Sequence, residues 1–240
     1  MLLDDGDGAA AAQLRAYCHQ RRTGRPWLRA KWAMTLDGRL ATSAGSSRWV
    51  SGAAARAWVH EQRDRADALL VGAGTVLADD PQLTVRLDDS PRPPRQPLRI
   101  VVDSAGRTPA DARLFTDGAA PTLWVVGADH QPPPRPGVEQ LVLPELDGHV
   151  DLAALAAELG RRGLLDILCE AGGGLTGALL RAGLVDEVAA IVAPKLVGGS
   201  GPTAWTGPGQ EPMSAALELV DPEWQQLGRD ILIIGRLRNE

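Results

Sequence analysis

The feature that most constrains the fold is an apolar run that ends in a carboxylate and a glycine-rich turn. Ile167–Cys169 is followed by Glu170, by three glycines at Gly172–Gly174, and by the helix-forming stretch Leu175–Leu180. A strand–glycine–helix junction places backbone N–H groups at the positive end of a helix dipole, where a phosphate can approach the main chain. Ligands of open α/β sheets bind at this edge, so the junction predicts a phosphate site beside an acid.

The same glycines have a purely steric explanation. Glycine is common at strand–helix turns, and this run lacks the G-x-G-x-x-G spacing of dinucleotide-binding turns. Other parts of the chain therefore have to decide between a phosphate site and a simple turn.

Length and charge narrow the function classes. The 240 residues suit one or two compact domains, and the formal net charge of −5 leaves no basic stripe for a nucleic-acid backbone. No apolar stretch approaches the roughly 18 to 20 residues of a membrane span, and the N-terminus lacks the regions of a signal peptide. We expect a soluble, cytoplasmic protein that binds neither nucleic acid nor membrane.

The cysteines and histidines do not have the spacing of a metal site or a disulfide framework. Cys169 lies inside an apolar run, where a buried thiol is expected. His19, His60, His130 and His149 fall in the N-terminal segment, a helix and two loops. The sequence therefore predicts no bound metal.

The order of strands and helices predicts one α/β domain. Residues 1–26 are interpreted as an N-terminal extension of uncertain order with a helix around Gln13–Arg21, and residues 27–240 as the folded domain. Helices between the early strands and antiparallel strands at the end favour a three-layer fold with a mixed, mostly parallel central sheet. Helices are expected at Ala53–Arg65, with Ser51 as its N-cap, and from Asp151 to Leu159; strands are expected at Leu28–Met34, Ala68–Val71, Leu98–Val102, Thr122–Val126, Val138–Leu143, Leu164–Cys169, Val185–Ala193, Leu217–Val220, Trp224–Leu227 and Asp230–Leu237.

Four separated motifs carry a resemblance to a known family. They are Lys31–Gly38, Ser47–Trp49, Val71–Arg86, and Glu170–Gly174 followed by Ala193–Gly199. In this order they resemble the reductase half of the bacterial riboflavin-pathway pyrimidine deaminase/reductase, over about residues 28–237. The resemblance implies a dihydrofolate-reductase-like fold, a homodimer, and NADPH-dependent reduction of 5-amino-6-(5-phosphoribosylamino)uracil to the ribitylamino product.

One departure from that family is large. The bifunctional proteins carry a zinc deaminase with H-x-E and P-C-x-x-C signatures, and neither signature occurs in these residues. We therefore expect a reductase domain alone, at residues 27–240. Two alternatives stay open: a reductase of the same fold that acts on another heterocycle, such as a dihydrofolate-like or natural-product intermediate, and a nucleotide-binding module without turnover.

The resemblance also implies which residues hold a phosphorylated pyrimidine. Planar guanidinium groups suit a phosphate, although Arg63 could equally be a solvated residue of a helix face. A hydroxyl at Ser47 could accept or donate a hydrogen bond, or could belong to an ordinary loop. The implied substrate-binding residues are Ser47, Arg63, Leu83, Arg86 and Glu170.

Lys31, Asp79 and Glu170 are the candidate catalytic residues. A protonated amine at Lys31 could donate a proton to an imine nitrogen or anchor the ribose phosphate. Asp79 could orient the opened sugar or the cofactor, or could simply belong to an Asp-Asp-Pro turn. Glu170 could accept hydrogen bonds from the substrate, or supply a proton if burial raises its pKa.

The implied NADPH-binding residues lie in five separate parts of the chain. Trp49 offers a broad aromatic face, although a tryptophan before a helix is more usually part of the core. Ser104, with Arg107 nearby, could donate to the adenosine 2′-phosphate, while the glycine run could hold the pyrophosphate. The full set is Ala33, Trp49, Thr75, Asp79, Ser104, Gly172, Gly173, Gly174, Leu175, Thr176, Gly177 and Ala178.

Overall fold

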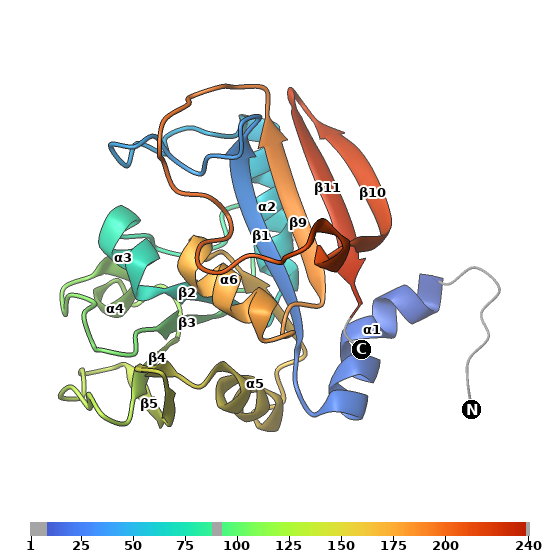
Figure 1. The fold of residues 1–240 in the computed structure, drawn as a ribbon. Coiled ribbons are helices and arrows are strands. Elements are labelled where there is room, and N and C mark those ends of the chain that lie inside the picture. Colours follow the sequence, from blue (N-terminus) through green and yellow to red (C-terminus); the bar gives the residue numbers. More distant parts are fainter. Residues whose placement is uncertain (1–8, 88–92, 239–240) are drawn as a thin grey trace.

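The computed structural model describes residues 9–87 and 93–238, with side chains from residue 14 onward. Its centre is a nine-stranded sheet in the order β10-β11-β9-β1-β8-β2-β3-β4-β5 (Figure 1). The strands of this sheet are β1 (Trp27–Thr35), β2 (Ala68–Gly72), β3 (Leu98–Val102), β4 (Thr122–Gly127), β5 (Glu139–Leu143), β8 (Asp166–Cys169), β9 (Glu187–Ala193), β10 (Leu219–Leu227) and β11 (Asp230–Leu237). Two short strands, β6 (Glu145–Leu146) and β7 (His149–Val150), pair separately as an antiparallel hairpin.

The sheet is mixed. The seven strands from β9 to β5 in that order run parallel to their neighbours. At the other side, β11 pairs antiparallel with β9, and β10 pairs antiparallel with β11. This arrangement confirms the predicted fold class, a mostly parallel sheet with antiparallel C-terminal strands.

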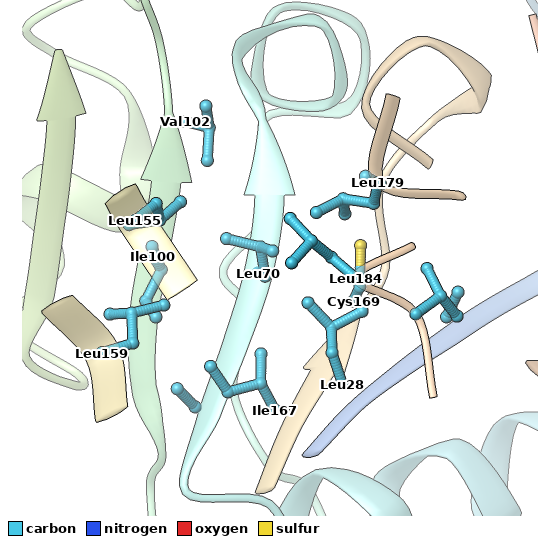
Figure 2. Packing of buried hydrophobic residues seen from close by; sticks show 14 of the residues in the cluster. Leu28, Leu70, Ile100, Val102, Leu155, Leu159, Ile167, Cys169, Leu179 and Leu184 are labelled. Carbon is cyan, nitrogen blue, oxygen red and sulfur yellow. The ribbon is translucent and has the colours of Figure 1, made fainter. Parts of the chain in front are cut away.

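Helices cover both faces of the sheet. They are α1 (Ala9–Thr23), α2 (Ala53–Arg65), α3 (Ala73–Asp79), α4 (Arg113–Thr116), α5 (Leu152–Arg161) and α6 (Gly173–Arg181), with a 3-10 turn at Met213–Ala215. On one face, α5 and α6 pack on strand residues such as Leu70 and Ile100 (Figure 2). On the other, α3 and α4 pack on residues such as Leu69 and Val101, and α2 packs on β9 and β11. Successive strand residues face opposite layers because strand side chains alternate.

Two element boundaries differ from the expectation. Gly52, not Ser51, is the N-cap of α2, and it has no capping side chain. The N–H of Gly52 donates to Asp230 Oδ2 at 2.6 Å, which ties the start of α2 to the start of β11. The two strands expected near Leu217 and Trp224 form a single strand, β10, whose pairing is irregular between Val220 and Glu223. Pro222 accounts for the misjudged break, because proline donates no ladder hydrogen bond.

The segment before residue 27 contains a longer helix than expected. The described part of the extension holds α1, and its last turn leads to Arg25, which forms two hydrogen bonds to Asp186 at 2.7 and 2.8 Å. Asp186 also accepts the backbone N–H of Leu28 at 2.8 Å, and its side chain is 2% exposed. A single buried carboxylate thus joins the end of the extension, the start of β1 and the chain just before β9. The boundary placed at residue 26 stays a prediction.

We predict that Asp186→Ala lowers the free energy of unfolding by about 3 to 5 kcal/mol, since it leaves a largely buried guanidinium without its anion. Urea denaturation followed by circular dichroism measures the change. The control is Asp221→Asn, which breaks the exposed ion pair between Asp221 and Arg236 and tolerates the left-handed backbone at this position (φ 47°). It should cost no more than about 1 kcal/mol. Equal losses in the two variants would contradict this assignment.

Candidate active site

A cavity of about 530 Å³ lies beside β1, at the carboxyl ends of β2 and β8. Parallel strands bring residues distant in sequence to this edge, because Lys31 follows Ala30, which pairs with Cys169 in the neighbouring strand. Most of the predicted site residues line the cavity. They are Lys31, Ala33, Ser47, Trp49, Arg63, Thr75, Asp79, Arg86, Glu170 and Gly172.

Glu170 holds two cations at the floor of the cavity. Arg63 donates to its carboxylate through Nε at 2.6 Å and Nη2 at 3.0 Å, and Lys31 Nζ lies 3.4 Å from Oε2. The carboxylate is 9% exposed, and the Arg63 and Lys31 side chains are each 14% exposed. The third nitrogen of Arg63, Nη1, donates to the carbonyl of Thr84 at 3.0 Å. Strand β8, helix α2 and strand β1 are therefore joined by one buried charge cluster.

This cluster decides between the two roles considered for Glu170. Burial alone would raise the carboxyl pKa, but the charges and hydrogen bonds of Arg63 and Lys31 outweigh it and lower the pKa of Glu170 to about 2. The condition for a proton-donating Glu170 is not met, since the group is ionised at neutral pH. What remains is a carboxylate that orders its neighbours and accepts hydrogen bonds.

Arg63 and Arg86 have different environments. Arg63 is not the solvated helix residue of the alternative interpretation, since it is buried and ion-paired; the charge of Glu170 raises its pKa despite burial. Arg86 is exposed at the mouth of the cavity. The turn before it contains Leu83 with a left-handed backbone (φ 51°), a conformation that non-glycine residues rarely adopt. After Leu83, the backbone N–H of Arg86 donates to His60 on α2.

Two titratable residues that line the cavity were missed by the sequence analysis. Arg56 and His60 lie on α2 together with Arg63 and line the same cavity. Their spacing of four and then three residues places them on one helix face, and that spacing was the available signal. Desolvation, followed by the charges of Arg63 and Arg86, lowers the pKa of His60 to about 4.

Trp49 forms part of the opposite wall. Its side chain is 62% exposed, so the alternative interpretation of a core tryptophan is wrong. The guanidinium of Arg56 lies over the indole ring, 4.4 Å from its centroid, and Lys195 Nζ donates to the Trp49 carbonyl. Arg56 and Lys195 thereby hold Trp49 in place at the cavity.

The glycine run serves two purposes. A Cβ on Gly173 would overlap the carbonyl oxygen of Thr203, and one on Gly177 would lie 2.6 Å from the carbonyl oxygen of Thr206. These two glycines are therefore required for close packing of the 203–206 segment on α6. At Gly172 and Gly174 the nearest atom is a threonine hydroxyl at 3.9 Å, which leaves space at the helix start. The steric interpretation accounts for Gly173 and Gly177, and the ligand interpretation of Gly172 and Gly174 stays a prediction.

Other expected site residues lie away from the cavity lining. Leu83 is 4% exposed and packs in the core against α3 and α4. The hydroxyl of Ser104 accepts the backbone N–H of Val150 at 2.9 Å. Of the expected cofactor segment, the cavity lining reaches Gly172 and does not include Gly173, Gly174, Leu175, Thr176, Gly177 or Ala178.

The remaining titratable groups add little to the site. Cys169 is buried as expected, and burial raises the pKa of its thiol to about 12. Among residues 9–87 and 93–238, no three His, Cys, Asp or Glu side chains gather as a metal site would require.

Within the same ranges, no helix has the length and apolar character needed to cross a membrane.

The sequence also matches a known protein family over most of its length. The model of the RibD C-terminal domain matches residues 26–233. The chain belongs to the RibD C-terminal domain family. The matched residues include every strand of the sheet, with β11 matched in part, and every residue that lines the cavity.

Relatives within the family are of two lengths. The riboflavin biosynthesis protein RibD of Escherichia coli is 36% identical over 91% of this chain and 62% of its own length. A reductase of Methanothermobacter thermautotrophicus, named for 2,5-diamino-6-ribosylamino-4(3H)-pyrimidinone 5′-phosphate, is 40% identical over 87% of this chain and 97% of its own length. The chain thus spans about three-fifths of the RibD relatives and nearly all of the archaeal one.

Solved structures share the fold. RibD of Acinetobacter baumannii superposes with a TM-score of 0.82 at 32% identity, over 96% of this chain and 63% of that one. The yeast riboflavin biosynthesis reductase Rib7 superposes with a TM-score of 0.73 over 95% of this chain and 99% of its own, and at 23% identity it shows the fold alone.

We predict that Glu170→Gln lowers the free energy of unfolding at pH 7 by about 3 to 5 kcal/mol, because two buried cations lose their anion. The wild-type advantage should be constant above the ordinary glutamate pKa of 4.5 and be lost as the pH falls toward about 2. The direction follows because a lowered folded-state pKa stabilises only the ionised form. Urea titrations between pH 3 and 8 measure both quantities, and an advantage that persists unchanged to pH 3 would contradict it.

We predict that Gly173→Ala costs about 1 to 3 kcal/mol of stability, because the added methyl group must displace the Thr203 carbonyl. Gly174→Ala is the matched control one residue away and should change stability by less than about 1 kcal/mol. Thermal unfolding of the two variants tests the packing role. A larger loss for Gly174→Ala would contradict the assignment of Gly173 to packing.

Proposed function

We propose that the chain is a pyrimidine reductase that reduces 5-amino-6-(5-phosphoribosylamino)uracil, or its non-deaminated form, to the ribitylamino product. The observation that carries the proposal is one cavity with four cationic side chains, Lys31, Arg56, Arg63 and Arg86, against two carboxylates. Such a surplus of positive charge suits a phosphorylated substrate. The names of the family relatives support this choice of substrate.

A nicotinamide cofactor fits the other side of the same cavity. Trp49 and Ala33 line the cavity, and an added Cβ at Gly172 or Gly174 would have no neighbour nearer than 3.9 Å. The start of α6 therefore leaves room for an anion at the positive end of the helix dipole. Bound NADPH would supply the hydride. The preference for NADPH over NADH belongs to the proposal, as does the contact of Ser104 with the adenosine phosphate.

In the proposed reaction the sugar opens to an imine, C1 accepts a hydride and the nitrogen accepts a proton. Lys31 lines the cavity, and Glu170 orients its ammonium group at 3.4 Å. We assign proton donation to Lys31 and not to Glu170, which is already ionised. Asp79, at the end of α3, lies on the cavity wall, where it can accept hydrogen bonds from the sugar hydroxyls.

The test is an assay of NADPH oxidation at 340 nm with the deaminated and the non-deaminated pyrimidine. We expect turnover with one of them, and a lower kcat/KM with NADH. Lys31→Met should lower kcat by about 10²- to 10⁴-fold, the usual contribution of acid–base catalysis. Lys31→Arg, which keeps the charge, should restore folding and binding but not the rate. Full activity of Lys31→Met would contradict the assigned role.

The two alternative functions predict different outcomes. A reductase of another heterocycle would oxidise NADPH with a member of a substrate panel but not with either pyrimidine. A binding module would bind NADPH in calorimetry and transfer no hydride. The largely buried Lys31–Glu170–Arg63 cluster argues against the second alternative, because such a charged arrangement is costly to keep without a use.

We further propose that the protein acts as a cytoplasmic homodimer. The outer strand β10 presents an unpaired edge in the described part of the chain, and Trp224 and Ile231 on the β10–β11 hairpin are 67% and 49% exposed. Large exposed apolar side chains on a sheet edge suit an interface. Light scattering of the purified protein should give twice the monomer mass of 25.4 kDa.

A further inference from the structure

His60 occupies a position in the cavity that the proposed reaction does not yet use. It lies on α2, four residues after Arg56 and three before Arg63, and its ring lines the cavity with both of them. The backbone N–H of Arg86 points at its Nδ1 atom at a distance of 3.2 Å. The histidine therefore bridges the helix and the segment that carries Arg86.

This hydrogen bond fixes the tautomer. A backbone N–H can only donate, so Nδ1 must be the acceptor, and the proton of the neutral ring must be on Nε2. Desolvation and the nearby cations Arg63 and Arg86 also lower the ring pKa to about 4, which keeps it neutral near pH 7. Among the described residues, none accepts a hydrogen bond from Nε2. The ring thus presents one neutral N–H donor.

The charges around this donor point to an anionic ligand. Lys31 comes from β1, Arg63 from α2 and Arg86 from the segment after α3, while Glu170 follows β8. Glu170 is hydrogen-bonded to Arg63 and offsets only one of the three cations. The charges beside the ring therefore remain positive on balance. A protonated histidine would be repelled there, whereas a neutral N–H donor adds a hydrogen bond without adding charge.

We propose that His60 is a substrate-binding residue whose Nε2–H donates to a phosphate oxygen of the substrate, beside Arg86. The inference rests on the proposed function for the identity of the substrate. It assigns His60 no part in proton transfer. Arg86 is coupled to the same site twice, because its side chain lines the cavity and its backbone holds the ring of His60.

The decisive variants are His60→Ala and His60→Gln. Alanine removes both the donor and the acceptor, so the KM for the pyrimidine should rise about 10- to 100-fold, the effect of a lost hydrogen bond to a charged group. The KM for NADPH and kcat should change by less than threefold. Glutamine offers an N–H donor and an oxygen acceptor of similar reach, so it should restore most of the affinity. His149→Ala, at an exposed residue of β7, is the matched control.

A purely structural role would give a different pattern. Loss of folding or of the cavity shape would lower kcat and raise both KM values, and it would lower the melting temperature of His60→Ala. A pyrimidine KM that is unchanged in His60→Ala would overturn the inference, as would a parallel rise in the KM for NADPH. Should the alanine variant fail to fold, His60→Phe keeps the ring volume without either nitrogen and takes its place.

The pH dependence tests the neutral state of the ring. The charged groups that face the ring are Lys31, Arg63, Arg86 and Glu170. Because the ring pKa is lowered to about 4, the pyrimidine KM of the wild type should follow the ionisation of the substrate phosphate alone between pH 5.5 and 8. His60→Gln should then give a parallel profile. A wild-type affinity that falls above about pH 6.5 relative to that of His60→Gln would show a cationic histidine and would overturn the neutral assignment.

Binding of ribose 5-phosphate, measured by calorimetry, separates this inference from the proposed function. We expect the wild type and His60→Gln to bind it and His60→Ala to bind at least tenfold more weakly. If the wild type reduces neither pyrimidine but shows this binding pattern, the function fails and the phosphate site stands. If turnover is found and ribose 5-phosphate binds all three proteins equally, or does not bind the wild type, the inference fails and the function stands.

Discussion

The active site depends on a largely buried cluster in which Glu170 holds Arg63 and Lys31. Bringing one carboxylate and two cations out of water is costly, and the cost is offset here by two short hydrogen bonds from one guanidinium and a third contact from an ammonium. Glu170 directly follows β8, and its two partners come from α2 and β1, so the cluster ties the sheet to the helix that forms the cavity wall. In the proposed mechanism, an ionised Glu170 leaves proton donation to Lys31.

In the proposed function, the cluster lies between a phosphate-binding part of the cavity and a cofactor-binding part. On the α2 side, Arg86 and the neutral donor of His60 favour a phosphate, while Arg63 has its fork turned toward Glu170. On the other side, Trp49 with Ala33 and the open helix start at Gly172 suit a nicotinamide cofactor. A reductase needs both ligands in contact, and the carboxyl edge of a parallel sheet brings the two halves together.

The sequence predicted the sheet because strands depend on local patterns, and apolar runs located nearly every strand. The resemblance to a family, carried by four separated motifs, supplied Lys31, Asp79 and Glu170, which the structure places on one cavity. Pairings between distant residues could not be predicted in this way. The pKa of Glu170 depends on Arg63, which is 107 positions away, and Gly173 is explained only by Thr203, which packs over it. His60 was dismissed because no metal spacing surrounds it, although its helical spacing to Arg63 was visible.

The ionisation state of Glu170 can be measured by carbon-13 NMR of the protein labelled at the glutamate side-chain carboxyl. The signal of Glu170 is assigned by its loss in Glu170→Gln. We expect a carboxylate chemical shift that is constant from pH 8 down to pH 5, with titration only toward about pH 2. A midpoint between pH 6 and 8 would contradict it, because Glu170 would then be protonated at neutral pH and could act as the acid.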